Sequence, residues 1–539
     1  MSTPVPRWNP SSIATRREQM LLARLGNHRK LFAFLYRYRL ELFDDAFQDE
    51  LAAMYRDTGE GRLPVPPALL AMVLLLQAYH GVSDREAVEL TVVDLRWQLV
   101  LGILGAETQA FGQSTLQAFR DRMTAHGMDL RLLERTIELA KKTQGFDWKK
   151  LPKTLRLAID SRPLEGAGRV EDTINLLGHA AFKLLRAAAA LLKLKAEEIA
   201  ACAGAHVFLA PSIKTGLDID WFDPEQKAEA IVELTRQIDA LEAWIRRQAG
   251  AAADEAPLKE LFDCIAQLRA QDLQPEPPGG GKPRIREGVA KDRRVSIEDP
   301  QMRHGRKSKS KRFKGYKQHI VNDLDTELIL AASVTPANRP EGEGAAELAK
   351  DLSRSPRNEK IDEVYIDRAY VGCALVRDAS TAGARILCKP RTAANGELFS
   401  KDDFKKNFKL RTITCPAGQT QRFVPGQTVE FEPRICGACS LRSRCTSASN
   451  DAGRTVHIAA DEIQQQRFRK LVSTTKGREA LRQRVHIEHR LAHLSHKQGP
   501  RARYLGLRKN LFDLRRHCAV LNLENIHRHG GVLVMHNAA

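Results

Sequence analysis

Three acidic residues in three different local settings have the chemistry needed to hold divalent cations. Asp160 ends the largely apolar run of residues 155–159, and Asp367 ends a second such run, residues 364–366. Glu488 lies much later, in a stretch of helical character. We predict that these carboxylates converge on a pair of Mg²⁺ or Mn²⁺ ions, because hard oxygen ligands suit both metals. Paired metals of this kind activate a water and stabilise the leaving oxygen in phosphodiester chemistry.

Each carboxylate also has a purely structural interpretation. The two aspartates would then be turn-forming residues at strand ends, and Glu488 would form an ion pair with Arg484, one helical turn away. In the metal-site interpretation, Arg484 shares the face of Glu488 and holds a phosphate in a charge-assisted contact. For each residue alone the structural interpretation is the simpler one, so the rest of the chain must decide.

The chain as a whole is strongly basic. It carries 85 Lys and Arg against 66 Asp and Glu, a formal net charge of +19. Such an excess attracts polyanions, and nucleic acid is the commonest large polyanion in a cell. The alternative is a solvated basic surface that keeps the protein soluble. With 539 residues, of which 43% are hydrophobic, the chain can build roughly three or four domains or large insertions.

We expect a cytoplasmic protein with no membrane partner. Residues 1–8 lack the apolar segment of a signal peptide. The longest purely apolar run, residues 68–76, is far short of the ~20 residues that a membrane span needs. Nine cysteines in so long a chain do not resemble a secreted disulfide scaffold.

The N-terminal region reads as a set of helices up to about residue 145. Residues 66–79 form a long apolar stretch opened by prolines, as at a helix start. Ser83 with Glu86 three residues on resembles a capping box, and Ser114 begins a second capping signal. Short helices with Arg and Gln on their exposed side can dock on DNA. The alternative is an ordinary helical domain.

Beyond it, apolar strands and helices are interleaved. Residues 155–160 predict a buried strand, residues 173–273 predict helices, and residues 274–281 form a Pro- and Gly-rich linker. Further strands are predicted at residues 315–321, 328–334, 364–366 and 384–388, with helices at 342–352 and 374–382. This order predicts an α/β fold, a mixed sheet with flanking helices, in which the two aspartates lie on neighbouring strands.

Two insertions interrupt the predicted sheet, one helical and one containing clustered cysteines. We therefore expect an all-α N-terminal domain at residues 1–150, a core at residues 151–172, 283–391 and 466–530, a helical insertion with its linker at 173–282, and a Cys-bearing insertion at 392–465.

Four of the nine cysteines form a C-x20-C-x2-C-x5-C array, made of Cys415, Cys436, Cys439 and Cys445. One Cys-x2-Cys knuckle with two further cysteines can give Zn²⁺ a tetrahedral thiolate shell, although the final spacing is wider than in a standard zinc ribbon. Such a zinc would hold the insertion together and take no part in chemistry. Free thiols in a reducing cell are the alternative.

Two basic segments are candidates for contact with a DNA backbone. Residues 303–317 hold eight Lys or Arg and no acid, with Phe313 and Tyr316 between them, and a second group follows Glu488. Each phosphate that such residues neutralise adds to the salt dependence of binding. A disordered, solvated loop is the alternative for the first segment. The candidate residues are Lys311, Arg312, Lys314 and Lys317, then Arg501, Arg503, Tyr504, Arg508 and Lys509.

Several short motifs, taken in their order, resemble a bacterial insertion-sequence transposase of the DDE class. They are Ala-Ile-Asp-Ser at 158–161, Gly-Tyr-Lys at 315–317, Val-Thr-Pro-Ala-Asn at 334–338, Tyr-Ile-Asp-Arg-Ala-Tyr at 365–370, Arg484 with Glu488, the basic group at 501–509, and Asn522 with Leu523. Each motif alone is short, and their order and spacing carry the resemblance. The helical N-terminal region and the Cys-bearing insertion also resemble this group, so the likeness covers most of the chain. It implies an RNase H-like fold.

The chain departs from the family pattern near Glu488. Related transposases often carry a Tyr three residues before the Arg of this motif, where Leu481 stands here, and a Lys seven residues after the Glu, where Ser495 stands. Lys497, two residues further on, is our candidate for that DNA contact. These departures concern the contacts to DNA ends more than the metal site.

The resemblance implies a transposase that acts on the ends of its own element. Metal at the three carboxylates would activate water to cut one strand, and the freed 3′-hydroxyl would attack target DNA. The partners would be double-stranded DNA, as terminal inverted repeats and as target, and a second copy of the chain to form a dimer on DNA. Such a protein would work at the bacterial nucleoid. The alternatives are a transposase-derived DNA-binding protein that no longer cuts and an RNase H-like nuclease unrelated to mobility.

Overall fold

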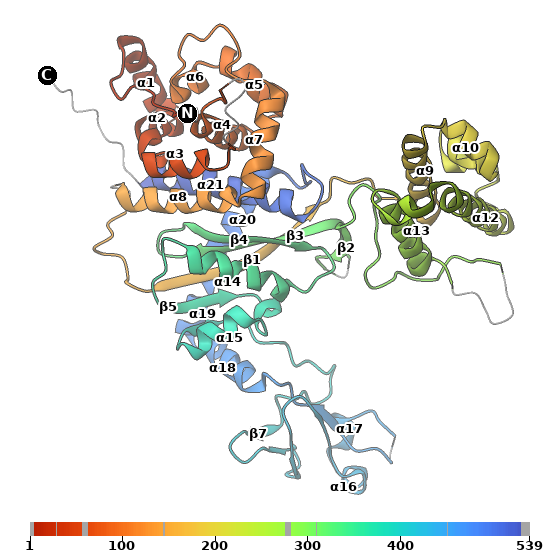
Figure 1. The fold of residues 1–539 in the computed structure, drawn as a ribbon. Helices are drawn as coiled ribbons and strands as arrows, with labels where there is room; N and C mark the ends of the chain where they lie inside the picture. The colour runs from red at the N-terminus through yellow and green to blue at the C-terminus, as the bar shows by residue number, and fades with distance from the viewer. Residues whose placement is uncertain are drawn as a thin grey trace.

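The computed structural model describes residues 5–28, 30–56, 63–143, 146–274, 282–308, 310–449 and 451–529. Apart from Gln274, the predicted Pro- and Gly-rich linker lies outside these ranges. Figure 1 shows the N-terminal helices above a central sheet, a lobe of helices to one side of the sheet, and a small lobe around β7, α16 and α17 at the far end.

The N-terminal region is helical, as predicted. Its helices are α1 (Arg16–His28), α2 (Lys30–Leu42), α3 (Asp45–Ala52), α4 (Pro67–His80), α5 (Asp84–Val93), α6 (Leu95–Leu101), α7 (Gln113–Ala125) and α8 (Met128–Lys142). The capping box of Ser83 and Glu86 is confirmed at the start of α5, with both reciprocal hydrogen bonds present. The second capping prediction is wrong, because α7 begins at Gln113 after Gly112, which places Ser114 inside the helix.

The central sheet is mixed, which confirms the predicted α/β fold. Its strands are β1 (Leu155–Glu165), β2 (Arg303–Arg306), β3 (Arg312–Asp323), β4 (Ile329–Pro336), β5 (Ile361–Ile366) and β6 (Arg385–Leu387). The order across the sheet is β2-β3-β1-β5-β6, and β4 also pairs with β3. Strand β1 is antiparallel to β3 and parallel to β5. The intervening elements are η3 (Glu341–Gly344), α14 (Ala345–Arg354), η4 (Arg368–Tyr370) and α15 (Ala374–Thr381).

Strand β1 is longer than its apolar run predicts, so Asp160 lies inside the strand rather than at its end. The pairing with β5 stops at Ile159, but the pairing with β3 continues as far as Glu165 opposite Gly315. The polar residues after Asp160 read as a strand end because their partner is the remote strand β3, which supplies the hydrogen bonds.

One hydrophobic core joins the N-terminal helices to the sheet. Helix α21 (Leu507–His529) packs against α8 and α4 and also against β4. Within this layer, the buried Arg515 forms ion pairs of 3.0 Å with Asp129 of α8 and 2.6 Å with Asp351 of α14. A single arginine therefore ties three elements together, and the helical region is fixed on the sheet by packing as well as by charge.

The two insertions each have a core of their own. The first contains α9 (Thr173–Leu192), α10 (Ala196–Ala203), η1 (His206–Leu209), α11 (Ile213–Leu217), α12 (Pro224–Ala249), η2 (Gly250–Asp254) and α13 (Leu258–Asp272). The second contains β7 (Lys405–Asn407), β8 (Thr412–Thr414), β9 (Thr420–Arg422), β10 (Thr428–Glu430), α16 (Pro433–Gly437), α17 (Arg442–Cys445) and β11 (Thr455–His457). Helices α18 (Glu462–Ser473) and α19 (Thr475–Arg482) lead back to α20 (Val485–Gln498).

Among the described residues, one helix is long and apolar enough to cross a membrane by length and composition, namely α9. Half of its most apolar window is buried. Its buried side chains, such as Leu177, Leu184 and Ala188, belong to the core of the helical insertion. Core helices of soluble proteins pass the same test, so α9 is weak evidence for a membrane span.

Candidate active site

The register of two parallel strands brings Asp160 and Asp367 together. Ile159 of β1 pairs with Ile366 of β5, and an aspartate follows each of them. Adjacent strands lie ~4.8 Å apart, so the two aspartates leave neighbouring points of the sheet. The predicted proximity of Asp160 and Asp367 follows directly from this pairing.

Asp160 is the more buried of the two aspartates, with 15% of its side chain exposed. Burial raises the pKa of Asp160 to about 6, and the charges of Asp367 and Glu341 push it in the same direction. A hydrogen bond of 2.8 Å from the backbone N–H of Ser161 and the charge of Arg484 act against this rise in pKa. Asp160 is thus a carboxylate held where a nearby positive charge is strongly favoured.

Helix α20 brings Glu488 to the same place. Ile487 and Leu494 are buried, and the helix packs against β1. Arg484, at the N-terminus of α20, donates to Glu488 Oε1 at 2.7 Å and to Asp160 Oδ2 at 3.4 Å. One guanidinium therefore bridges the two carboxylates. The ion pair of the structural interpretation is present, and it includes Asp160 as well.

The three carboxylates offer the ligand chemistry of a divalent-cation site, because Mg²⁺ and Mn²⁺ bind hard oxygens. In the part of the chain that the structure describes, however, no group of three or more His, Cys, Asp or Glu is placed to hold a metal ion. Arg484 supplies positive charge between two of the carboxylates. The oxygen ligands of these residues suit such cations. In this structure the positive charge beside Asp160 and Glu488 comes from Arg484.

A buried hydrogen-bond network lies beside this site, and none of its members was among the predicted site residues. His319 of β3 contacts Tyr370 Oη at 2.6 Å through Nδ1 and Thr335 Oγ1 at 2.9 Å through Nε2. Full burial lowers the pKa of His319 to about 3, so the ring is neutral. A Cβ on Gly344 would lie 2.7 Å from this ring, which leaves room only for glycine there. The network fastens the turn after Asp367 to the sheet.

The basic residues beyond Glu488 contact other parts of the protein. Arg503 donates to the carbonyl of Val82, Tyr504 accepts from Arg120 at 3.1 Å, Arg508 pairs with Asp129 at 3.0 Å, Lys509 pairs with Asp121 at 3.7 Å, and Lys497 pairs with Glu524 at 2.8 Å. Most of these partners belong to N-terminal helices, so the group helps to dock the helical region. DNA contact by these five residues stays a prediction.

The basic segment at residues 303–317 is a β-hairpin over its described residues, not the disordered loop of the alternative interpretation. Strand β2 and the first part of β3 pair in antiparallel register from Arg303 opposite Gly315 to Arg306 opposite Arg312. Only the second of these strands was anticipated, and it begins three residues earlier than its apolar pattern indicates. The hairpin carries the candidate residues Lys311, Arg312, Lys314 and Lys317.

The four clustered cysteines line one small cavity of about 60 Å³ in the second insertion. Burial raises the pKa of the Cys445 thiol, and the other three cysteines raise it further. The thiols thus gather, but they form no metal-ligand group among the described residues. The predicted structural zinc has no support in this geometry, and the four residues are free cysteines.

The mixed sheet with its flanking helices has the arrangement of an RNase H-like fold. Residues 290–523 match the family described as "Transposase DDE domain", and residues 27–122 match a second family described as a transposase domain. Together the two matches span more than half of the chain. The chain therefore belongs to the DDE transposases of insertion sequences, which confirms the resemblance.

The family match has a limit that bears on the site. It contains Asp367 and Glu488, but it begins after Asp160, which the large helical insertion separates from it. A search among curated proteins and a search among solved structures each found no match. Membership of the family implies action on DNA and use of a divalent metal, typically Mg²⁺.

Proposed function

We propose that this transposase cuts DNA at the ends of its own element and joins the freed 3′-hydroxyl to target DNA. The observation that carries this proposal is that Arg484 bridges Asp160 and Glu488, while the pairing of β1 with β5 places Asp367 next to Asp160. Three segments that are remote in sequence supply these residues, and no packing requirement explains why all three should be acidic.

In this proposal the three carboxylates bind the cation and Arg484 binds the DNA. Asp160 and Asp367 would hold a divalent cation at the ends of the paired segment, and Glu488 would complete the ligand set. When bound, such cations polarise phosphoryl oxygens and lower the pKa of water. Arg484 would then leave its carboxylate partners and hold a DNA phosphate, because a guanidinium matches phosphate oxygens with two parallel hydrogen bonds.

The proposal includes double-stranded DNA as terminal inverted repeats and as target, with the N-terminal helices reading the repeats. Two ends must be joined in one event, so we expect two copies of the chain on DNA. The setting would be the bacterial nucleoid. The net charge of +19 supports DNA binding, because it favours encounter with a polyanion.

The test is cleavage of a duplex that carries the element's terminal repeat, with Mg²⁺ or Mn²⁺, by wild type and Asp367→Asn. We expect wild type to cut and the variant to bind without cutting. Asp362→Asn is the matched control, because Asp362 is exposed on β5, the strand that Asp367 follows, and has no side-chain partner among the described residues. Equal cutting by wild type and Asp367→Asn would refute the proposal.

The two alternatives give different results in the same experiment. Binding without cleavage by wild type in either metal would favour a transposase-derived DNA-binding protein. Cleavage without joining of a pre-cut 3′ end to target DNA would favour a nuclease unrelated to mobility.

A further inference from the structure

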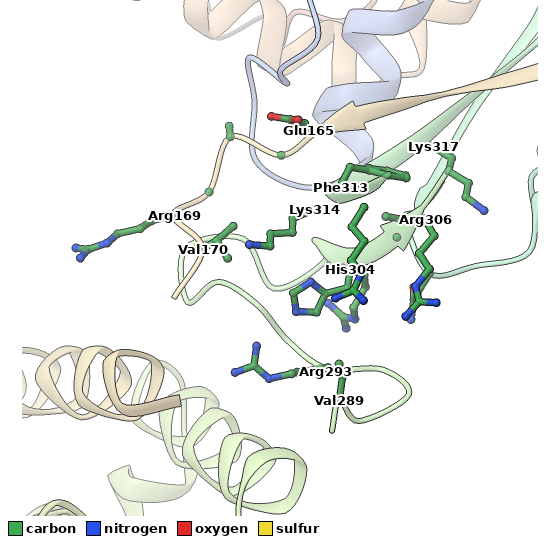
Figure 2. Close-up of a pocket in the computed structure, with 18 of the residues that line it drawn as sticks. Glu165, Arg169, Val170, Val289, Arg293, His304, Arg306, Phe313, Lys314 and Lys317 are labelled. Carbon is green, nitrogen blue, oxygen red and sulfur yellow. The ribbon is translucent and has the colours of Figure 1, made fainter. Parts of the chain in front are cut away.

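A large groove lies where the helical insertion returns to the sheet, away from the carboxylates. Its volume is about 1310 Å³. Nine Lys or Arg and two Glu line it, the basic residues being Arg169, Lys291, Arg293, Arg303, Arg306, Arg312, Lys314, Lys317 and Arg501. Figure 2 shows Val289 and Arg293, on the segment that returns from the insertion, opposite the strand with Phe313 and Lys317. The groove is thus formed by the insertion junction and the β2–β3 hairpin together.

The hairpin places two arginines directly opposite each other, because Arg306 pairs with Arg312 in the antiparallel register. In the same register His304 pairs with Lys314. Since side chains alternate between the faces of a strand, these four lie on one face, and the buried Phe313 lies on the other. Like charges directly opposite each other destabilise a sheet. This repulsion between like charges lies on an exposed face of the hairpin, where a bound anion would neutralise it.

The cations of the groove fall into two classes. Arg293 pairs with Asp272 at 2.6 Å and Arg303 pairs with Asp292 at 3.0 Å, so these arginines belong to the wall. A second class has neither an ion pair nor a side-chain hydrogen bond to any residue that the structure describes. Its members are Lys291, Arg306, Arg312 and Lys314. Four exposed, uncompensated cations around one groove are a binding surface for a polyanion.

The pKa of His304 reflects the charges around it in the groove. Burial lowers the pKa of His304, and the charges of Arg293 and Lys314 lower it further. The charge of Asp272 acts in the opposite direction, whereas Glu165 and Glu298, the two acids that line the groove, are not among the main causes of the shift in pKa. The surroundings of His304 are therefore mainly cationic, as the lining residues indicate.

We propose that this groove binds the sugar–phosphate backbone of the DNA that flanks the element, on the far side of the cut from the terminal repeat. The inference rests on the proposed function, since the active site defines where the flank begins. It assigns to the insertion junction a DNA site distinct from the metal site.

The distance between the two sites fits this assignment. Strand β1 carries Asp160 and ends at Glu165, which lines the groove. Five residues of extended strand span roughly 17 Å. A DNA strand advances 3.4 Å per nucleotide, so backbone in the groove would lie about five nucleotides from the phosphate at Asp160. Lys317, opposite Pro163 of β1, is the lining residue of the hairpin that lies nearest to Asp160 along this register.

The lining chemistry favours the flank over the terminal repeat. Cations dominate the polar side chains, and Asn338 is the one amide among the lining residues that the structure describes. Charges contact phosphates in any sequence, whereas base recognition uses amides and bidentate arginines aimed at base edges. The flank of a mobile element differs at every insertion site, so a sequence-independent contact suits it.

The experiment compares wild type with the double variant Arg306→Ser/Arg312→Ser, both in an Asp367→Asn background to prevent cutting. The probes are labelled duplexes that end in the terminal repeat and carry none, about five or about ten base pairs of flank, the spacing set by the strand rise. In wild type we expect affinity to rise with flank length. In the double variant this gain should be lost, and the slope of log K against log salt should fall by about two units on flanked DNA.

The matched control is Arg247→Ser/Lys259→Ser, which removes the same charge from exposed residues of α12 and α13 that do not line the groove. It should behave as wild type. Should the hairpin variant fail to fold, Lys291→Gln/Lys314→Gln replaces it and is expected to show the same loss. An equal loss of affinity on flank-free DNA would overturn the assignment to the flank, and no loss on any probe would overturn the groove as a DNA site.

These outcomes are independent of cleavage. A protein that binds flanked DNA through the groove but never cuts would refute the proposed function and leave the groove as a DNA site. A protein that cuts normally, and whose affinity for flanked DNA is unchanged in the hairpin variant, would refute the groove as a DNA site and leave the proposed function standing.

Discussion

The carboxylate site and the basic groove lie along the same strand, β1, and are built in opposite ways. At the first, Asp160 is largely buried and Arg484 compensates it. At the second, exposed cations of like sign face one another without partners among the described residues. A small cation must be held at a fixed point, which requires ligands of set geometry. A long polyanion needs only a line of accessible positive charge, so its site can remain solvated until it binds.

The largest expected effect is the loss of cutting without the loss of binding. Asp160→Asn should lower the cleavage rate by more than about a hundredfold, since even one electrostatic contact made in the transition state is worth that much. DNA affinity should be unchanged or higher, because a negative charge is removed. Cleavage rate and affinity would be measured separately at saturating and limiting DNA. The groove variant should show the opposite pattern, and a variant in which both quantities fall together would break the comparison.

Arg484→Ala tests whether the arginine serves the cation or the DNA. If it holds a phosphate, its removal should slow cleavage about ten- to a hundredfold, because a hydrogen bond to a charged group contributes roughly 1.5–3 kcal/mol. Cation affinity, measured by titration of Mn²⁺, should not fall, because a competing positive charge has gone. Arg482→Ala, two residues earlier and exposed at the end of α19, is the matched control. A marked fall in Mn²⁺ affinity would mean that Arg484 positions the carboxylates.

The smallest effect concerns stability and pH. The pKa of Asp160 rises from its ordinary 3.8 to about 6 on folding, chiefly through burial. The folded chain therefore binds this proton more tightly than the unfolded chain, and the associated stability is full below the ordinary pKa and lost as pH rises through about 6. In metal-free buffer, Asp160→Asn should be more stable than wild type by roughly 1–3 kcal/mol at neutral pH.

Urea unfolding from acid to neutral pH would measure this difference, which should vanish toward the acid end. Adding Mg²⁺ should shrink it at neutral pH, because the cation stabilises the charged wild type. A pH-independent difference would show that Asp160 is not buried as a carboxylic acid, and that the two sites are less different than the structure indicates.

Much of the site could be predicted from the sequence because its cause is local. The apolar runs before Asp160 and Asp367 predict strands, and aspartates at equivalent points of adjacent parallel strands must meet. The i,i+4 relation of Arg484 and Glu488 places both on one helix face. None of these steps needs knowledge of a distant contact beyond the pairing of two strands.

Two of the differences from the predictions depend, by contrast, on contacts with segments far away in the chain. The extension of β1 beyond Asp160 depends on hydrogen bonds from β3, more than a hundred residues later. The contacts of Tyr504 and Arg508 are made with the N-terminal helices, whereas the basic character of the segment around them predicted a contact with DNA. The capping error at Ser114 arose because Gly112 starts the helix two residues earlier.

The sequence by itself determined the class of protein, the helical and strand content, and the carboxylates that define the candidate active site, because residue type and short-range periodicity carry that information. Only the tertiary structure decided where the charges go. It placed Arg484 between Asp160 and Glu488, used part of the second basic group for internal docking, and left the cations of the β2–β3 hairpin unpaired. Whether a charge finds a partner depends on segments far away in the chain, and no local pattern records that.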